Sequence, residues 1–320
     1  RRQRQMCIRD RVQHDDPEPR NVTYSPNLGR FCLIDFELAT LLPAPTHASS
    51  HDSGVWKLSW SARTRRGTKH VANDDAFLAL EVTPSDARRL EADGEELLEP
   101  AHLVLAVSDG MGGNNAGELA SRLILSWVRK NARQLYDAFL QPEEAGPELG
   151  DLLRNAHEGI NDLSANDPKL EGMGATVTLA WITPSHLHLA HIGDSRLYLH
   201  RDGATTQLSE DHTRLWKKWK RGEISEVQYR GHPRRNALYD VLGSGYATIC
   251  PQIRSYPLRD GDRLLLCSDG LVDGLWEKHI HEGLGSESTS AGTARGLLSR
   301  SAQSDGQDDI TLIVADVAQL

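Results

Sequence analysis

Cysteine is scarce in this chain of 320 residues, and the four that occur, Cys7, Cys32, Cys250 and Cys267, lie far apart. Without close pairs, they match neither a disulfide framework nor a zinc-binding pattern. The sequence also has no apolar run long enough to cross a bilayer and no recognisable signal peptide. We therefore expect a protein of the reducing cytoplasm that has no membrane partner.

Basic residues are outnumbered, with 36 Lys and Arg against 45 Asp and Glu, a net charge of −9 and a pI of about 5.9. This balance argues against a nucleic-acid partner, because a nucleic-acid-binding face would be basic. The hydrophobic fraction of 38% and the charged fraction of 25% are typical of a folded globular chain.

Acidic residues, by contrast, stand at the ends of four short apolar runs, which are bounded by Gly or Asp and predict buried strands. Neighbouring antiparallel strands start and end at the same edge, so we expect the acids to meet at one edge of a sheet. Such oxygen-rich clusters suit Mg²⁺ or Mn²⁺. The alternative for any single segment is a plain Asp-Gly turn. The four segments are Asp74-Asp75 before residues 76–82, Asp109 after 102–107, Asp269 after 263–267, and Asp308-Asp309 before 310–317.

Strands in pairs and helices near residues 117–138, 149–163 and 291–301 predict an α+β fold with an antiparallel sheet core. Seven motifs in order resemble the metal-dependent protein phosphatase 2C family, and its bacterial branch in particular. The motifs are Asn73-Asp-Asp-Ala76, Asp109-Gly-Met-Gly-Gly113, Gly172-Met-Gly-Ala-Thr176, Gly193-Asp-Ser-Arg196, Ser209-Glu-Asp-His212, Ser268-Asp-Gly-Leu271 and Gln307-Asp-Asp-Ile-Thr311.

The resemblance implies two packed antiparallel sheets flanked by helix pairs, an αββα sandwich over residues 55–320, and a protein serine/threonine phosphatase. It implies two Mn²⁺ or Mg²⁺ ions that activate a water molecule, with a third ion as an option. The partners would be phosphorylated proteins and a cognate Ser/Thr kinase, and the expected state is a monomer. The implied ligands are Asp109 as a bridge, the Gly110 carbonyl, Asp269 and Asp308, with Asp74 and Asp75 around them and Asp194 at the third site.

Three positions depart from the family pattern. His70 stands where the family has a phosphate-binding arginine, a role that Arg65, Arg66 or Lys69 could also fill. Asp74 replaces the usual Glu, and Asp309 replaces the usual Asn. These departures keep open a second hypothesis, a pseudophosphatase that uses the same fold as a binding module. We nevertheless predict that the protein is a catalyst and that the catalytic residues are Asp109, Asp269, Asp308 and His70.

Residues 211–245 fall where the bacterial family carries its flap beside the active site. Two basic runs, Trp216–Arg221 and His232–Asn236, make this segment basic within an acidic chain. It is either a solvated helix face or a reader of anionic phosphopeptides. We predict that Arg234 and Arg235 of the flap, together with Arg66 and His70, bind substrate.

The chain does not begin with Met, and we expect it to be a piece of a longer protein. Residues 1–54 form a tail in which His14, Asp16, Asn21 and Asp35 resemble a kinase catalytic loop and metal-binding segment, with Glu37 in place of a glycine. The match is either chance or the remnant of an upstream kinase-like domain. The Gly-rich loop and lysine of a kinase are absent, so we expect no ATP chemistry here.

Overall fold

The computed structural model describes residues 22–25, 30–33, 54–112, 116–140 and 142–320. The chain divides into two compact units, Arg1–Asp52 and Ser53–Leu320. In the first unit, β1 (Val22–Ser25) pairs with β2 (Arg30–Leu33) in antiparallel fashion. The kinase-like positions lie outside the described residues; they are His14, Asp16, Asn21, Asp35 and Glu37.

The second unit contains two antiparallel sheets. In the first sheet the order is β13-β8-β7-β9-β10-β14, and β4 joins β7 to β5. In the second sheet the order is β12-β11-β15-β16-β3-β6. The first sheet consists of β4 (Asp75–Val82), β5 (Ala87–Arg89), β7 (His102–Met111), β8 (Gly174–Ala175), β9 (Val177–Ile182), β10 (His186–Ile192), β13 (Leu242–Gly243) and β14 (Gln252–Pro257); the second consists of β3 (Trp56–Arg65), β6 (Asp93–Leu97), β11 (Arg196–Arg201), β12 (Ala204–Gln207), β15 (Arg263–Cys267) and β16 (Ile310–Gln319).

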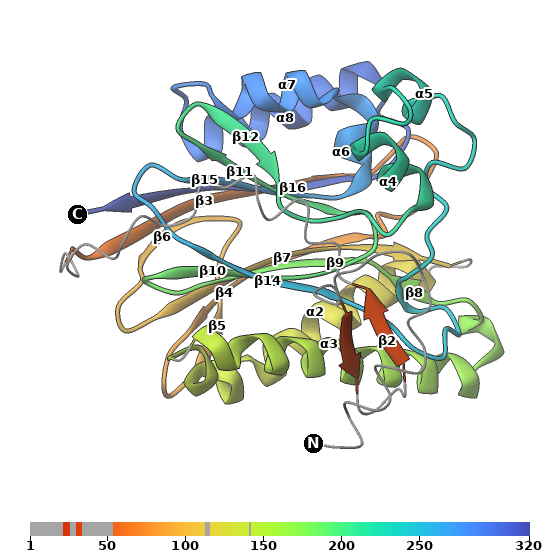
Figure 1. The fold of residues 1–320 in the computed structure, drawn as a ribbon, viewed down its shortest axis with the longest axis horizontal. Helices are drawn as coiled ribbons and strands as arrows, with labels where there is room; N and C mark the ends of the chain where they lie inside the picture. Colours follow the sequence, from red (N-terminus) through yellow and green to blue (C-terminus); the bar gives the residue numbers. More distant parts are fainter. Residues whose placement is uncertain (1–21, 26–29, 34–53, 113–115, 141) are drawn as a thin grey trace. The chain divides into compact units, whose positions relative to one another are not determined.

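Helices cover both outer faces of the stacked sheets (Figure 1). The first sheet is covered by α2 (Ala116–Leu135) and α3 (Pro142–Asn166). The second is covered by α6 (Asp269–Gly274), α7 (Glu277–Leu284) and α8 (Ser290–Ser304). Residues 211–245, the predicted flap, carry the short helices α4 (Arg214–Lys220) and α5 (Glu226–Arg230). None of the described helices combines the length and apolar character needed to cross a membrane.

The apolar runs are buried on both faces because a helix layer and a second sheet lie on opposite sides of each sheet. Along β7, Leu103, Leu105 and Val107 pack between the two sheets, whereas Val104 and Ala106 pack against the helix layer. Alternate side chains of a strand point to opposite faces, so a run of apolar residues can serve two cores. Each buried Leu or Val contributes about 1.5–3 kcal/mol to folding.

The predicted α+β fold with two antiparallel sheets between helix pairs is confirmed. One expectation is wrong: the four acidic segments do not share one sheet. Segments β4 and β7 belong to the first sheet, and β15 and β16 to the second. The two sheets stack, so the acids gather between two edges instead of along one.

Candidate active site

The acidic site forms where the two stacked sheets present the ends of their central strands. In the first sheet Asp75 lies directly opposite Asp109 in the register of β4 and β7. In the second, Asp269 begins α6 just after β15, and Asp308 lies just before β16. The Ser268 hydroxyl bridges the sheets by donating to Asp75 Oδ2 at 2.7 Å. The site is therefore held by rigid strands.

Crowding of carboxylates sets the electrostatics of the site. Burial, followed by the charges of Asp75, Asp194 and Asp308, raises the pKa of Asp109 well above its ordinary value. Burial and the charge of Asp109 do the same to the pKa of Asp269. Burial also raises the pKa of Asp75 to about 7, although hydrogen bonds from hydroxyl groups oppose the change. Carboxylates in this situation hold protons unless cations neutralise them.

The donor set fits divalent cations. Carboxylate oxygens of Asp269, Asp273 and Asp308 lie within 4.8 Å of one another. A Cβ atom at Gly117 would lie 2.8 Å from the Gly110 carbonyl oxygen and 2.9 Å from Asp74 Oδ2. Glycine at position 117 therefore keeps open the space in front of these two oxygens. Oxygen ligands on rigid strand ends are what Mg²⁺ and Mn²⁺ prefer.

Asp309 holds the loop 66–74, the His70 loop, through three hydrogen bonds to its buried carboxylate. The Gly67 N–H donates to Oδ1 at 2.7 Å, and the Asp74 N–H donates to Oδ2 at 2.7 Å. His70 Nδ1 lies 2.9 Å from Oδ2. The charge of Asp309 is therefore paired with hydrogen-bond donors of the His70 loop.

His70 faces the metal-binding side of the site through its other nitrogen. Its Nε2 lies 3.5 Å from Asp308 Oδ1. The hydrogen bond with Asp309 raises the pKa of His70, and the partial burial of the ring opposes this. The imidazole is therefore oriented by Asp309 and favoured in its charged form, so it can offer an N–H to an anion.

The other predicted substrate residues lie in different surroundings. Arg66 is exposed and donates to the Val71 carbonyl at 2.6 Å, within the His70 loop. Arg234 is exposed and lies in the turn that follows α5. Arg235 is tied to Asp273 by an ion pair. These three roles stay predictions; of the two flap arginines predicted to bind substrate, Arg234 is exposed and Arg235 is partly buried.

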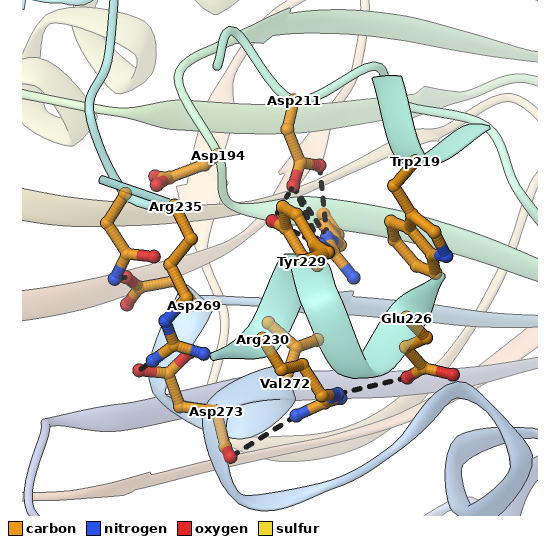
Figure 2. A pocket seen from close by; sticks show the side chains of 12 residues that line it. Asp194, Asp211, Trp219, Glu226, Tyr229, Arg230, Arg235, Asp269, Val272 and Asp273 are labelled. Atoms are coloured by element: carbon orange, nitrogen blue, oxygen red, sulfur yellow. Dashed lines mark hydrogen bonds and ion pairs between the residues drawn. The ribbon is translucent and has the colours of Figure 1, made fainter. Parts of the chain in front are cut away.

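Asp273 is a site residue that the sequence reasoning missed. It stands four residues after Asp269 on α6, so both side chains fall on one face of the helix. The spacing Asp-x-x-x-Asp after a strand was the available signal. In Figure 2, Asp269 and Asp273 lie on one side of a small pocket, next to the flap residues Arg230 and Arg235.

Hydrogen bonds connect the flap to residues of the site. Asn236 Nδ2 donates to Asp269 Oδ2 at 3.1 Å, and Arg230 donates to the carbonyls of Asp273 and Leu275. Asp194, whose pKa burial raises to about 7, lines the same pocket. The predicted third-site residue and the flap thus meet beside Asp269.

Arg196 and Asp211, to which the sequence analysis assigned no role, bind each other. Arg196 forms a buried, bidentate ion pair with Asp211, with Nη2 2.7 Å from Oδ2 and Nε 3.0 Å from Oδ1. The guanidinium also contacts Tyr229 and Trp219 of the flap. This cluster anchors the base of the flap, because breaking a buried ion pair is strongly unfavourable.

The structure therefore brings together six of the predicted site residues around the expected metal position. The six residues are His70, Asp74, Asp75, Asp109, Asp269 and Asp308.

Comparison with known proteins places this geometry in context. The family model described as Protein phosphatase 2C matches residues 96–303. The serine/threonine protein phosphatase PstP of Mycobacterium tuberculosis is 35% identical over 240 residues, which cover 73% of this chain and 44% of PstP. The chain thus spans less than half the length of this relative. The serine/threonine phosphatase stp of Listeria monocytogenes is 32% identical over 214 residues, covering 67% of this chain and 84% of stp.

Solved structures agree with these matches. The crystal structure of M. tuberculosis PstP/Ppp has a TM-score of 0.64 at 32% identity, covering 82% of this chain and 100% of that chain. The catalytic domain of PstP in complex with two manganese ions has a TM-score of 0.62 at 30% identity, with the same coverage of both chains. A serine/threonine phosphatase of S. agalactiae shares the fold, with a TM-score of 0.69 at 24% identity, covering 81% of this chain and 99% of that chain.

Proposed function

Because the chain belongs to the protein phosphatase 2C family, we propose that it is a metal-dependent protein serine/threonine phosphatase. The observation that carries the proposal is the convergence of Asp75, Asp109, Asp269 and Asp308 from two sheets on one point. Burial, followed by the charges of neighbouring carboxylates, raises the pKa of Asp109 and of Asp269, and bound cations would offset both effects.

We propose Asp109, the Gly110 carbonyl, Asp269 and Asp308 as the residues that hold two Mn²⁺ or Mg²⁺ ions. Such ions supply an activated water and neutralise charge on a phosphoryl group. The PstP structure with two manganese ions supports this choice. Asp74 and Asp75 would accept hydrogen bonds from the waters around the ions, and Asp194 would take part in a third site.

His70 would bind the phosphoryl group of the substrate. Its Nδ1 is engaged by Asp309, so its Nε2–H is the group left to donate to a phosphoryl oxygen. Asp309 fixes the orientation of the ring, as a carboxylate commonly does for a functional histidine. Arg66 and Arg234 would contact the polypeptide outside the reacting centre.

The test is hydrolysis of p-nitrophenyl phosphate and of a phosphothreonine peptide with Mn²⁺, with Mg²⁺ and with a strong chelator. We expect activity with either metal, none with chelator, and loss of nearly all activity in Asp109→Asn with the fold retained by circular dichroism. Full activity in chelator would overturn the two-metal proposal. No observation favours the pseudophosphatase alternative, since every carboxylate implied as a direct ligand is present.

We propose phosphorylated proteins as substrates and a cognate Ser/Thr kinase as the opposing enzyme. We also propose a monomer that works in the cytoplasm. The substrate class is supported by the relatives, which are serine/threonine phosphatases. Size-exclusion chromatography with light scattering would test the monomer.

A further inference from the structure

A groove with a volume of about 570 Å³ begins at the acidic site and follows β4 along helix α2. Asp75 lines the end nearest the acids, and Phe77 and Leu125 contribute apolar wall. Pockets of this size commonly hold ligands. The groove has no lining residue in common with the pocket under the flap, so the two are separate.

Three arginines line the groove in a chain whose net charge is −9. Arg122 and Arg129 are seven residues apart on α2 and share a face, and Arg89 ends β5. Arg122 pairs with Glu118 at 2.8 Å, but its side chain is 70% exposed. In the part of the chain that the structure describes, Arg89 and Arg129 are exposed and pair with no carboxylate. The groove is thus a local positive surface with unsatisfied charge.

The groove also exposes a backbone edge. The Ala79 carbonyl accepts a hydrogen bond from the Leu90 N–H at 2.8 Å, so the polar groups of Ala79 point away from β7. Backbone groups two residues earlier point the same way, so the N–H and C=O of Phe77 face outward too. Strand β5 pairs only with Leu80–Val82 and stops short of Phe77. Among the described residues, no loop or turn forms a backbone hydrogen bond with Phe77.

We propose that this groove, in the phosphatase inferred above, binds the substrate polypeptide on one side of the phosphorylated residue as an extended strand beside β4. An open strand edge gives main-chain hydrogen bonds, and pockets for side chains give selectivity. The arginines make anionic side chains the preferred neighbours, so the substrate class is acidic or multiply phosphorylated protein segments.

The geometry also sets where the anionic side chain lies. Arg89 is opposite Leu80 in the sheet, five residues along β4 from Asp75. Five residues of strand span roughly 17 Å. A substrate strand can pair with β4 only as far as Phe77, because Leu90 bonds to Ala79 and β5 follows. Beyond Phe77 an extended segment would continue along the groove, where an acidic side chain about five positions from the phosphorylated residue would reach Arg89, with Arg122 and Arg129 beside its path.

The experiment compares kcat/KM on phosphothreonine peptides with neutral flanks and with Glu or phosphoserine about five positions before or after the phosphothreonine. The variant is Arg89→Glu with Arg129→Glu. The matched control is Lys130→Glu with Arg133→Glu, which changes the same charge on α2 outside the groove. p-Nitrophenyl phosphate reports the reacting centre alone.

We expect the wild type to prefer the anionic peptide on one side. In the groove variant, kcat/KM on that peptide should fall on the order of tenfold, while kcat/KM on the neutral peptide and on p-nitrophenyl phosphate should stay unchanged. The control should keep the preference. Glu and phosphoserine peptides separate carboxylate from phosphate as the source of the anion. N-methylation of single peptide amides should weaken hydrolysis at the position beside Phe77 and not at its neighbours.

Equal losses on all three substrates would overturn the proposal, because the arginines would then support the fold. An unchanged preference in the groove variant, or an equal loss in the control, would overturn it as well. Absence of metal-dependent hydrolysis of every substrate by the wild type would instead overturn the proposed phosphatase function.

Discussion

Removal of the Asp309 carboxylate should destabilise the protein by loosening the His70 loop. The carboxylate is 3% exposed and accepts from two backbone N–H groups, those of Gly67 and Asp74, and contacts His70 Nδ1. A buried donor left without its acceptor costs about 1–3 kcal/mol. For Asp309→Ala we therefore expect a loss of roughly 3 kcal/mol in the free energy of unfolding, or roughly 6 °C in Tm.

Asp309→Asn should cost less than the alanine variant. The amide oxygen can still accept from the Gly67 N–H, and the amide N–H₂ can donate to neutral His70 Nδ1. The Asp74 N–H then loses its acceptor, so we expect a loss of about 1–2 kcal/mol. The hydrogen bond with Asp309 raises the pKa of His70, so its stabilisation is present at low pH and fades as pH rises through that raised pKa. The difference in the free energy of unfolding between wild type and Asp309→Asn should therefore become smaller as pH rises above about 6.5.

The assay is urea unfolding of metal-free protein in a double-mutant cycle with Asp309→Asn, His70→Arg and both. We expect the double variant to lose less than the sum of the single losses, because each single change leaves the other partner without its bond. Stability of Asp309→Ala equal to that of wild type would refute the role of the carboxylate. Strict additivity would refute the coupling of His70 to Asp309.

Three further outcomes follow from the site, the tail and the flap. Burial raises the pKa of Asp75 and of Asp194 to about 7, so in metal-free protein their contribution to stability falls as the pH rises from about 4 to 7. The increase in Tm on adding Mn²⁺ should therefore be larger at pH 7.5 than at pH 5.5. An equal increase at both pH values would contradict this reasoning. A chain starting at Ser53 should keep its Tm and its p-nitrophenyl phosphate activity, whereas a large loss of either would show that the tail supports the domain. Arg234→Glu should lower kcat/KM on phosphopeptides alone. Arg235→Glu should lower it on small esters too, because Arg235 pairs with Asp273 beside Asp269. Equal behaviour of the two variants would contradict these separate roles of Arg234 and Arg235.

The strands that carry the acids were predictable from the sequence because each is a short apolar run with acid at one end. Their distribution between two sheets was not, since a run such as 263–267 looks the same in either sheet. The partner of each strand depends on contacts over long sequence separations, such as β3 with β16. Local patterns therefore give the strands and the chemistry of their ends, but not the register that brings Asp75 to Ser268.

Side-chain partners across loops were the least predictable part of the site. Arg196 and Asp211 lie in two motifs fifteen residues apart, and nothing in the local sequence pairs them. Asp273 was within reach of sequence reasoning, because its spacing from Asp269 fits a helix that begins at Asp269. That helix was missed because the Ser-Asp-Gly tripeptide resembles the turn that follows a strand.

The two main departures from the family pattern, His70 and Asp309, are one structural feature. Taken singly, a histidine in place of arginine weakens anion binding, and an aspartate in place of asparagine adds charge beside a ligand. In contact, the aspartate orients the histidine, favours its protonated form and binds the backbone of its loop. At the phosphate-binding position that we propose for His70, the pair restores a cationic donor, which argues for a working catalyst. Departures of this kind should be judged by whether the changed residues touch each other, since each can supply what the other change removed.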